Sequence, residues 1–288
     1  MLLHQVGVVA EVSQVALGEL MRVAAALQKQ ASRDFAPIWG VKATVNAFQR
    51  LDDVPVGYWP VIVMDNIQQS GAGGVHLDRN GQPYALVQYD DAWSMTASHE
   101  TLEMLADPFG NRLQASQSLK PGQGRVEYLV EVCDPCEAPG YAYTVNGVTV
   151  SDFYTPHFFD PVASPGVRYS YTGAVQSPRD VLPGGYISWH EPVSDSWWQL
   201  LYFNDKKTFR KLDMTGRHEG SLRSKVDALT KRPDSATGRG RAAGALRELA
   251  LRSSSDDATS AKAEAWRREI ARLLRKAPRT QTRRTRKR

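Results

Sequence analysis

The sequence predicts an α+β fold: a small mixed sheet with an antiparallel edge strand lies over one central helix, and a β-rich segment and a helical basic C-terminal extension follow. Three observations predict this order. Apolar residues recur at helical spacing in residues 12–31 and again around residues 93–108. Short apolar or alternating runs between these two helices predict strands. Basic residues accumulate after residue 205.

Charge divides the chain into two parts. Of its 36 basic and 31 acidic residues, residues 206–288 hold 25 and 9, which leaves 11 and 22 in residues 1–205. The first part therefore has a formal charge of −11 and the second of +16. With 42% hydrophobic residues in 288, one sizeable core is expected. We therefore predict a globular domain over residues 1–205 and a basic linker and amphipathic helical tail over residues 206–288.

The N-terminal half predicts one helix and several strands. Residues 12–31 carry apolar side chains three and four positions apart and are expected to form the first helix. Residues 39–48 alternate and residues 61–64 form a short apolar run, so both are predicted strands. The first eleven residues contain neither Lys nor Arg, and nowhere does a run approach the ~18 apolar residues of a membrane span. A cytoplasmic protein is the expectation.

A hairpin precedes the central helix. Asn80 and Gly81 stand between two β-rich runs, at residues 75–78 and 84–89, and Asn-Gly is a strong signal for a tight turn. Pro83 at the start of the second run disfavours a central position in a sheet, so residues 84–89 are predicted to form an edge strand. Asp90 or Asp91 is then expected to cap the following helix.

The predicted central helix contains the candidate metal-binding and catalytic residues. His99 and Glu103 are four residues apart and share one face of a helix, with Glu100 beside them. The sequence His-Glu-x-x-Glu resembles the zincin motif His-Glu-x-x-His, in which the i and i+4 side chains bind zinc and the intervening Glu activates a water. A carboxylate is an accepted zinc ligand, so Glu103 can take the place of the second His.

The resemblance to zincins extends to the order of the elements. In that family, helix, strands, edge strand and motif helix follow one another, and the edge strand pairs with an extended peptide. The resemblance therefore implies that Ala85 and Val87 line a substrate groove. Zincins also need a third protein ligand. Phe109, at the metzincin spacing, cannot bind metal, so a downstream acid is expected.

Three acids are candidates for the third ligand. Glu131 is favoured, because a lone acid between Val130 and Val132 is costly to bury unless it is paired or bound to a metal. Asp134 and Asp107 are the alternatives.

Residues 85–203 also resemble a bacterial family of zincin-like proteins. The shared features are a Ser-His-Glu-x-x-Glu helix, a Glu-Val-Cys-Asp-Pro segment and a Gly-Val-x-Val-Ser-Asp-Phe segment. Residues 143–150 contain a second Asn-Gly hairpin signal, and residues 184–189 and 196–203 are predicted strands. Tyr154 is a candidate donor to a tetrahedral oxyanion, with His157 and His190 as further candidates.

The resemblance implies a zinc-dependent peptidase. His99, Glu103 and Glu131 would hold one divalent metal, and Glu100 would serve as general base. Two carboxylate ligands make a harder site, so Mn²⁺ or Ca²⁺ is an alternative to Zn²⁺. The competing hypothesis is a non-catalytic structural or nucleic-acid-associated protein with a zincin-like fold, with a relation to phage as one option, that acts through its basic arm.

Two further features leave their alternatives open. Cys133 and Cys136 form a Cys-x-x-Cys pair that is expected to be two reduced thiols at a strand end, with a redox role as the alternative. Residues 261–288 combine an amphipathic helix with a polybasic end, which suggests nucleic acid or an anionic membrane surface as a partner. A solvated tail, or a helix that docks on the acidic globule, is the alternative. The oligomeric state does not follow from the sequence.

Overall fold

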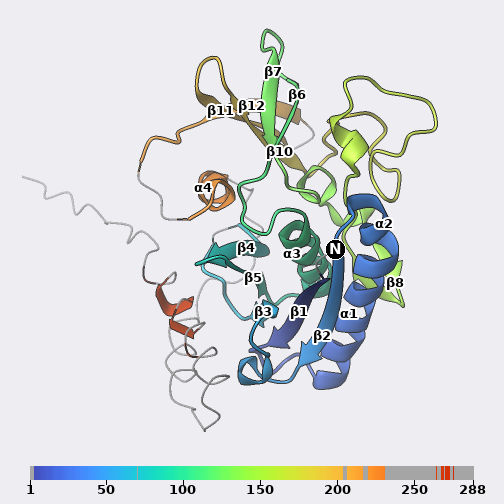
Figure 1. Ribbon diagram of the computed structural model, residues 1–288, viewed down its shortest axis with the longest axis vertical. Coiled ribbons are helices and arrows are strands. Elements are labelled where there is room, and N and C mark those ends of the chain that lie inside the picture. The colour runs from blue at the N-terminus through green and yellow to red at the C-terminus, as the bar shows by residue number, and fades with distance from the viewer. Residues whose placement is uncertain are drawn as a thin grey trace, which may run out of the picture.

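The computed structural model describes residues 3–69, 71–203, 206–216 and 220–230, together with residues 264, 267, 268, 270–272 and 275. It is a mixed α+β structure with two five-stranded sheets and a small hairpin (Figure 1). Its labelled α-helices are α1 (Leu17–Lys29), α2 (Ala36–Trp39), α3 (Trp93–Ala106) and α4 (Leu222–Leu229). None of them combines the length and hydropathy that a membrane span requires.

The first sheet has the strand order β2-β1-β3-β5-β4. Its strands are β1 (Leu3–Ala10), β2 (Lys42–Phe48), β3 (Trp59–Met64), β4 (Gly74–Arg79) and β5 (Gln82–Gln88). β1 pairs in parallel with β2 and β3, and β3 with β5, whereas β4 is antiparallel to β5. The sequence did not predict β1, and the first helix begins at Leu17 rather than at residue 12.

The expected edge strand is wrong in its position. β5 lies between β3 and β4, and it is β4 that forms the edge. Ala85 and Val87 are fully buried, and both are paired on either side, so neither lines an open edge. Pro83 is tolerated because the pairing of β5 with β3 begins only at Ala85. The turn itself is as predicted, because Asn80 and Gly81 both adopt positive φ values, 52° and 76°.

The two faces of the first sheet bury different side chains. Val61, Val63, Ala85 and Val87 belong to the main core beneath α1 and α3. Residues of the opposite parity, which face the other side of the sheet, form a second apolar cluster. This alternation of fully apolar faces is typical of parallel strands covered on both sides. It positions α3 directly against β5 and β4.

The second sheet has the order β12-β11-β10-β7-β6 and is antiparallel. Its strands are β6 (Leu113–Gln117), β7 (Arg125–Leu129), β10 (Tyr186–Glu191), β11 (Ser196–Phe203) and β12 (Lys206–Leu212). The second Asn-Gly signal forms the small hairpin of β8 (Tyr143–Val145) and β9 (Val148–Val150), as predicted. In Figure 1, α4 lies between this sheet and β4.

The expected domain boundary after residue 205 does not hold. β12 pairs with β11 along seven residue pairs, from Trp197–Leu212 to Phe203–Lys206. α4 packs through Val226, which is fully buried, against Leu129, Trp197 and Leu212 of the second sheet. Residues 206–216 and 220–230 therefore belong to the globule despite their basic composition.

The described residues of the C-terminal segment contact the globule. Ile270 is 5% exposed and lies in the second apolar cluster. Nη2 of Arg267 lies 2.9 Å from Oδ2 of Asp52. These contacts are those expected of a helix that docks on the globule. The predicted linker at residues 232–241 and the polybasic end at 283–288 lie outside the described residues.

A buried carboxylate links the N-terminal helices to the later loops. α1 continues into a π-helical segment, Gln30–Phe35, in which the side chain of Asp34 is fully buried. Nη2 of Arg33 donates to Oδ2 of Asp34 at 2.8 Å, Tyr143 donates to the same oxygen at 3.0 Å, and Tyr171 donates to Oδ1 at 2.8 Å. Burial alone would raise the pKa of Asp34, but these donors lower it below its ordinary value.

Asp34→Asn is expected to lower the free energy of unfolding by roughly 2–4 kcal/mol near neutral pH, because charge-assisted hydrogen bonds are lost. Since the folded pKa of Asp34 is depressed, its contribution is present above the unfolded pKa and is lost as the pH falls through the folded value. Urea unfolding of both proteins at several pH values measures the difference. A difference that grew as the medium became more acidic would contradict this account.

Candidate metal centre

α3 holds the motif residues inside the protein. Every position from Ala97 to Ala106 is buried, because the helix packs on β5 and β4 on one side and meets later segments on the other. Ala92, rather than the predicted Asp90 or Asp91, is the N-cap residue. Oδ1 of Asp90 nevertheless accepts a hydrogen bond from the Ala92 backbone N–H at 2.8 Å, which fixes the turn that leads into the helix.

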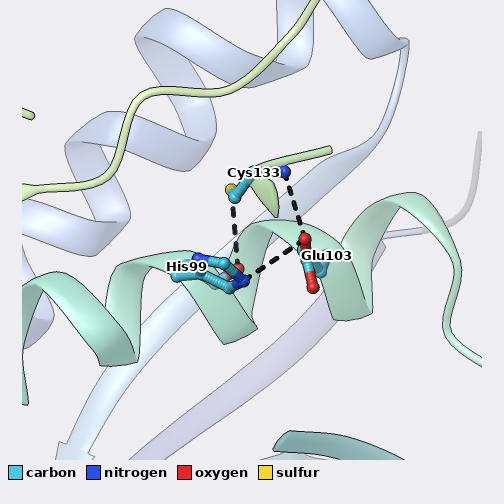
Figure 2. A group of neighbouring side chains, drawn as sticks. All are labelled: His99, Glu103 and Cys133. Carbon is cyan, nitrogen blue, oxygen red and sulfur yellow. Dashed lines mark hydrogen bonds and ion pairs between the residues drawn. The ribbon is translucent and has the colours of Figure 1, made fainter. Parts of the chain in front are cut away.

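His99 and Glu103 meet as their spacing predicts. Nε2 of His99 lies 3.3 Å from Oε1 of Glu103, one turn farther along α3. The backbone N–H of Cys133 donates to the same Glu103 oxygen at 3.1 Å (Figure 2). The thiol of Cys133 faces the carbonyl oxygen of His99 at 3.8 Å. The segment after β7 is therefore tied to the motif helix at this point.

Asp134, not Glu131, reaches His99. Oδ1 of Asp134 lies 3.2 Å from Nε2 of His99. Asp134 begins a short 3-10 turn, Asp134–Cys136, and this turn is held tightly: a Cβ on Gly185 would come within 2.6 Å of the Asp134 carbonyl oxygen. Among the described residues, three groups of side chains could share a cation: His99 with Glu103 and Cys133, His99 with Asp134 and Glu137, and His76 with Glu100 and Glu103. None of them contains Glu131, and His99 is the residue that the groups of Glu103 and Asp134 have in common.

Glu131 and Asp107 have other surroundings. Glu131 lies beyond the end of β7 rather than within the strand, and its Oε1 is 3.9 Å from Nη1 of Arg223. Burial, and then the charge of Asp134, raise the pKa of Glu131 well above its ordinary value. The carboxylate of Asp107 accepts the backbone N–H of Arg112 at 2.8 Å and so completes the turn after α3.

The environment of His99 suits a cation. Burial alone would lower the pKa of His99, but the charge of Glu103 and the hydrogen bond to Asp134 raise it well above 6.5. One N–H cannot serve two carboxylate oxygens with full hydrogen bonds at the same time. Atoms bound to zinc at ~2.0–2.1 Å and at the tetrahedral angle lie about 3.3 Å apart. The separations of Nε2 from the two oxygens, 3.2 and 3.3 Å, match that value.

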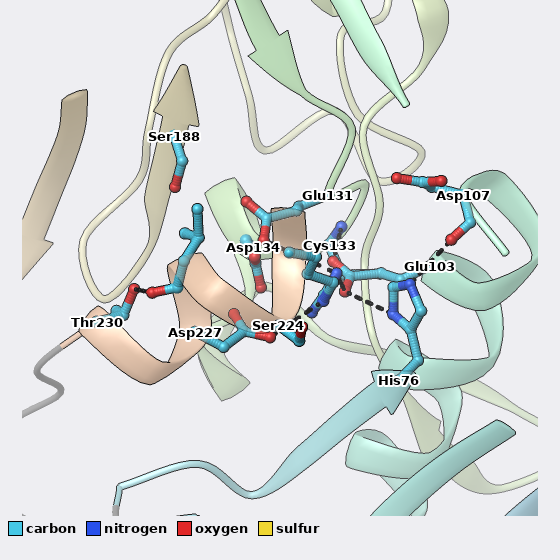
Figure 3. Close-up of polar contacts among 12 residues, drawn as sticks. His76, Glu103, Asp107, Glu131, Cys133, Asp134, Ser188, Ser224, Asp227 and Thr230 are labelled. Atoms are coloured by element: carbon cyan, nitrogen blue, oxygen red, sulfur yellow. Dashed lines mark hydrogen bonds and ion pairs between the residues drawn. The ribbon is translucent and has the colours of Figure 1, made fainter. Parts of the chain in front are cut away.

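Arg223 is a residue of the site that the sequence did not indicate. It lies on α4, is 2% exposed, and pairs through Nη1 with Oε2 of Glu103. Nη2 lies 4.0 Å from Oε2 of Glu100, and Nε lies 3.3 Å from Oδ2 of Asp227. Figure 3 shows Glu103, Glu131, Asp134 and Asp227 arranged around the start of α4. The apolar spacing of residues 222, 226 and 229 is the signal that could have indicated a packed helix here.

His76 is a second residue that the sequence analysis did not select. It lies on the edge strand β4 and is 1% exposed. Its Nε2 is 2.9 Å from the carbonyl oxygen of Asp107, which can only accept, so Nε2 carries the proton. Nδ1 then faces Oε2 of Glu103 at 3.8 Å (Figure 3) and lies at the same distance from Oε2 of Glu100.

The edge strand also lies against Glu100. A Cβ at Gly74, the first residue of β4, would come within 2.7 Å of Cγ and Oε1 of Glu100. Only glycine therefore allows β4 to approach α3 so closely. Glu100 itself is 3% exposed, so the proposed general base is enclosed between α3, β4 and Arg223.

The other predicted residues divide into two groups. Tyr154 is fully buried, and burial followed by the charges of Glu131 and Glu103 raises the pKa of its hydroxyl. His157 pairs with Asp160 at 2.9 Å on the surface, and His190 lies between Glu127 and Asp195 on the second sheet. Of the three oxyanion candidates, only Tyr154 adjoins the acidic residues of the site.

Both cysteines are buried free thiols. Burial raises the pKa of Cys133 and of Cys136 well above the ordinary value, which disfavours the thiolate that redox chemistry requires. Cys133 contributes to the site through its backbone N–H.

Comparisons of this chain with known protein families, with curated proteins and with solved structures found no match. A functional hypothesis must therefore come from the site itself.

Proposed function

We propose that this protein is a zincin-like, metal-dependent hydrolase of peptide bonds. The observation that carries the proposal is the position of Nε2 of His99, 3.3 Å from Oε1 of Glu103 and 3.2 Å from Oδ1 of Asp134. An imidazole nitrogen and two carboxylate oxygens are the donor set of a catalytic zinc or manganese site with three protein ligands. Asp134 thus replaces Glu131 as the third ligand in the proposal.

The charges around the proposed ligands also favour a cation. Five acidic side chains, Glu100, Glu103, Glu131, Asp134 and Asp227, lie around one guanidinium and two imidazoles. Buried carboxylates are costly unless a positive charge compensates them. A divalent cation would supply that charge. When bound, it would also polarise a carbonyl group and lower the pKa of a coordinated water from ~15.7 toward ~7.

Glu100 is proposed to move the proton. It follows His99 directly on α3, so its carboxylate lies beside the proposed ligands, and its Oε2 accepts no hydrogen bond from the described residues. This oxygen would take a proton from the attacking water and pass it to the leaving nitrogen. The hydroxyl of Tyr154 would donate to the oxyanion that forms on the carbonyl oxygen.

The edge strand suggests an extended peptide as the substrate. β4 has a pairing partner on only one side within its sheet, and its first residue, Gly74, touches Glu100. An added strand that pairs with the outer edge of β4 would pass close to the general base. A peptide bond is therefore the expected scissile group.

Glu100→Gln tests this function. The substitution keeps the size of the side chain but removes the proton acceptor, so hydrolysis should fall by at least ~100-fold while one metal ion per chain is retained. Elemental analysis of the purified full-length protein and cleavage of a mixed peptide library give the two readings. His157→Gln is the control, because His157 is exposed and its ion pair is with Asp160. Equal cleavage by wild type and Glu100→Gln would contradict the proposed hydrolysis with Glu100 as general base.

A closed, non-catalytic metal centre is the second candidate, and burial favours it. His99 is 8% exposed, while Glu103 and Asp134 are fully buried, and structural metal sites are closed whereas catalytic sites keep an open position. Such a centre would bind metal and raise the midpoint of thermal unfolding, yet no peptide in the library would be cleaved. The same two measurements therefore separate the two candidates.

A further inference from the structure

The start of α4 is anchored to the turn that ends α3. The backbone N–H of Arg223 donates to the carbonyl oxygen of Gly110 at 2.9 Å, and that of Leu222 donates to Oδ1 of Asn111 at 2.8 Å. Gly110 has a φ of +60°, and a Cβ there would lie 2.5 Å from Oγ of Ser221. Ser221 caps α4 by accepting the backbone N–H of Ser224 at 3.1 Å. Arg223 is therefore fixed relative to the motif helix.

The rest of α4 holds Arg223 in a buried position. Val226 packs against the second sheet, so α4 lies between that sheet and α3. The side chain of Asp227, one turn after Arg223, lies 3.3 Å from Nε of Arg223. A guanidinium loses its hydration on burial, and such a position is tolerated only where acidic groups surround it. The guanidinium is thus a built-in charge of the site and not a surface residue.

The two oxygens of Glu103 have different partners. Oε1 faces Nε2 of His99 at 3.3 Å and accepts the backbone N–H of Cys133 at 3.1 Å. Oε2 pairs with Nη1 of Arg223 and lies 3.8 Å from Nδ1 of His76. One oxygen therefore points toward the proposed metal ligands, and the other points toward Arg223 of α4 and His76 of β4.

We propose that Arg223 is the positioning residue that makes Glu103 equivalent to the second histidine of a zincin site. Because the guanidinium of Arg223 pairs with Oε2 of Glu103, only Oε1 is available to the metal. Glu103 would therefore bind the metal through one atom, as an imidazole does. Its charge also offsets that of Glu103, and the pair together is neutral, like a neutral imidazole. This inference rests on the proposed metal site, and it explains how His-Glu-x-x-Glu can replace His-Glu-x-x-His.

A second metal ion at His76, Glu100 and Glu103 is the competing explanation of the same contacts. These three side chains could share a cation. The guanidinium of Arg223, however, already reaches Oε2 of both glutamates, through Nη1 and Nη2. The guanidinium of Arg223 therefore already supplies the positive charge that would otherwise favour a second cation beside Glu100 and Glu103.

Binding of Co²⁺ to full-length protein tests the role of Arg223. Wild type should bind one Co²⁺ per chain with the intense visible absorption of a four-coordinate ion. In Arg223→Gln the freed Oε2 should join the coordination, so the ion becomes five-coordinate and the band loses more than half of its intensity. Arg223→Lys, which keeps one charge on Oε2, should restore most of the band. Arg210→Gln is the matched control, because Arg210 is an arginine bonded to the other end of α4, at the Leu229 carbonyl oxygen.

Each outcome decides between the explanations. An unchanged band in Arg223→Gln, or a weak band in Arg223→Lys, would overturn the positioning role while leaving the metal site intact. Cobalt bound by Arg223→Gln but not by wild type would show that Arg223 excludes the metal. Two Co²⁺ per chain in wild type would favour the second metal ion. No cobalt in any variant would remove the proposed function itself. Should Arg223→Gln fail to fold, the Lys variant still decides.

Discussion

Asp134→Ala is expected to lower the affinity for Zn²⁺ or Mn²⁺ by at least ~100-fold, whereas Glu131→Gln should leave it within about threefold of wild type. The reason is distance. Asp134 has an oxygen 3.2 Å from Nε2 of His99, while the contact of Glu131 is with Arg223 at 3.9 Å. Titration of the metal-free protein in competition with a chelator measures both affinities.

These two acids form a matched pair for that experiment. Both are buried, three residues apart, and both follow β7. A general loss of negative charge near His99 would weaken binding in both variants alike. The opposite ranking, with Glu131→Gln the weaker binder, would restore the ligand set that the sequence favours and would remove Asp134 from the site.

Local features of the fold followed from the sequence. The two Asn-Gly turns form hairpins because both positions of each turn accept positive φ, as at Asn146 and Gly147 with 51° and 77°. The spacing of His99 and Glu103 placed them in contact because residues four apart share a helix face. Such signals depend only on neighbours in the chain.

Features of the fold that depend on contacts between distant parts of the chain could not be predicted from the sequence. A hairpin signal does not show which arm faces outward, so the sequence predicted the edge strand at residues 84–89, whereas β4 forms the edge. The apolar run of residues 83–87 was the available hint, because strands buried on both faces carry such runs. β1 near the terminus was missed because strand pairing, and not local alternation, defines it.

The sequence predicted a site made of one helix and downstream residues, and in the structure four segments form the candidate site. α3 supplies His99 and Glu103, the loop after β7 supplies Asp134, β4 supplies His76 and α4 supplies Arg223. The contribution of Arg223 could not be predicted, because residues 206–288 contain many basic residues and their composition does not show which one is buried. Only tertiary structure shows which basic residue lies against Glu103.

Arg223→Met is expected to lower the free energy of unfolding of the metal-free protein by about 3–5 kcal/mol near neutral pH. The substitution leaves Glu103 buried without its strongest ion pair. Glu103→Gln in the same chain should recover part of the loss, because the uncompensated charge is then absent. The two single variants and the double variant form a cycle, and the interaction energy from urea unfolding should be on the order of 2–3 kcal/mol.

The pH dependence of that loss follows from the pKa of Glu103. Burial raises this pKa, but the charges of Arg223 and His99 outweigh burial and hold it well below the ordinary value of 4.5. The ion pair therefore stabilises the fold above the unfolded pKa, and the benefit disappears as the pH falls through the folded value. The difference between wild type and Arg223→Met should accordingly persist from about pH 7 to about pH 5 and shrink as the pH falls from about 5 toward about 2. A difference that stayed constant below about pH 5 would mean that Arg223 stabilises the protein by packing and not through the charge of Glu103.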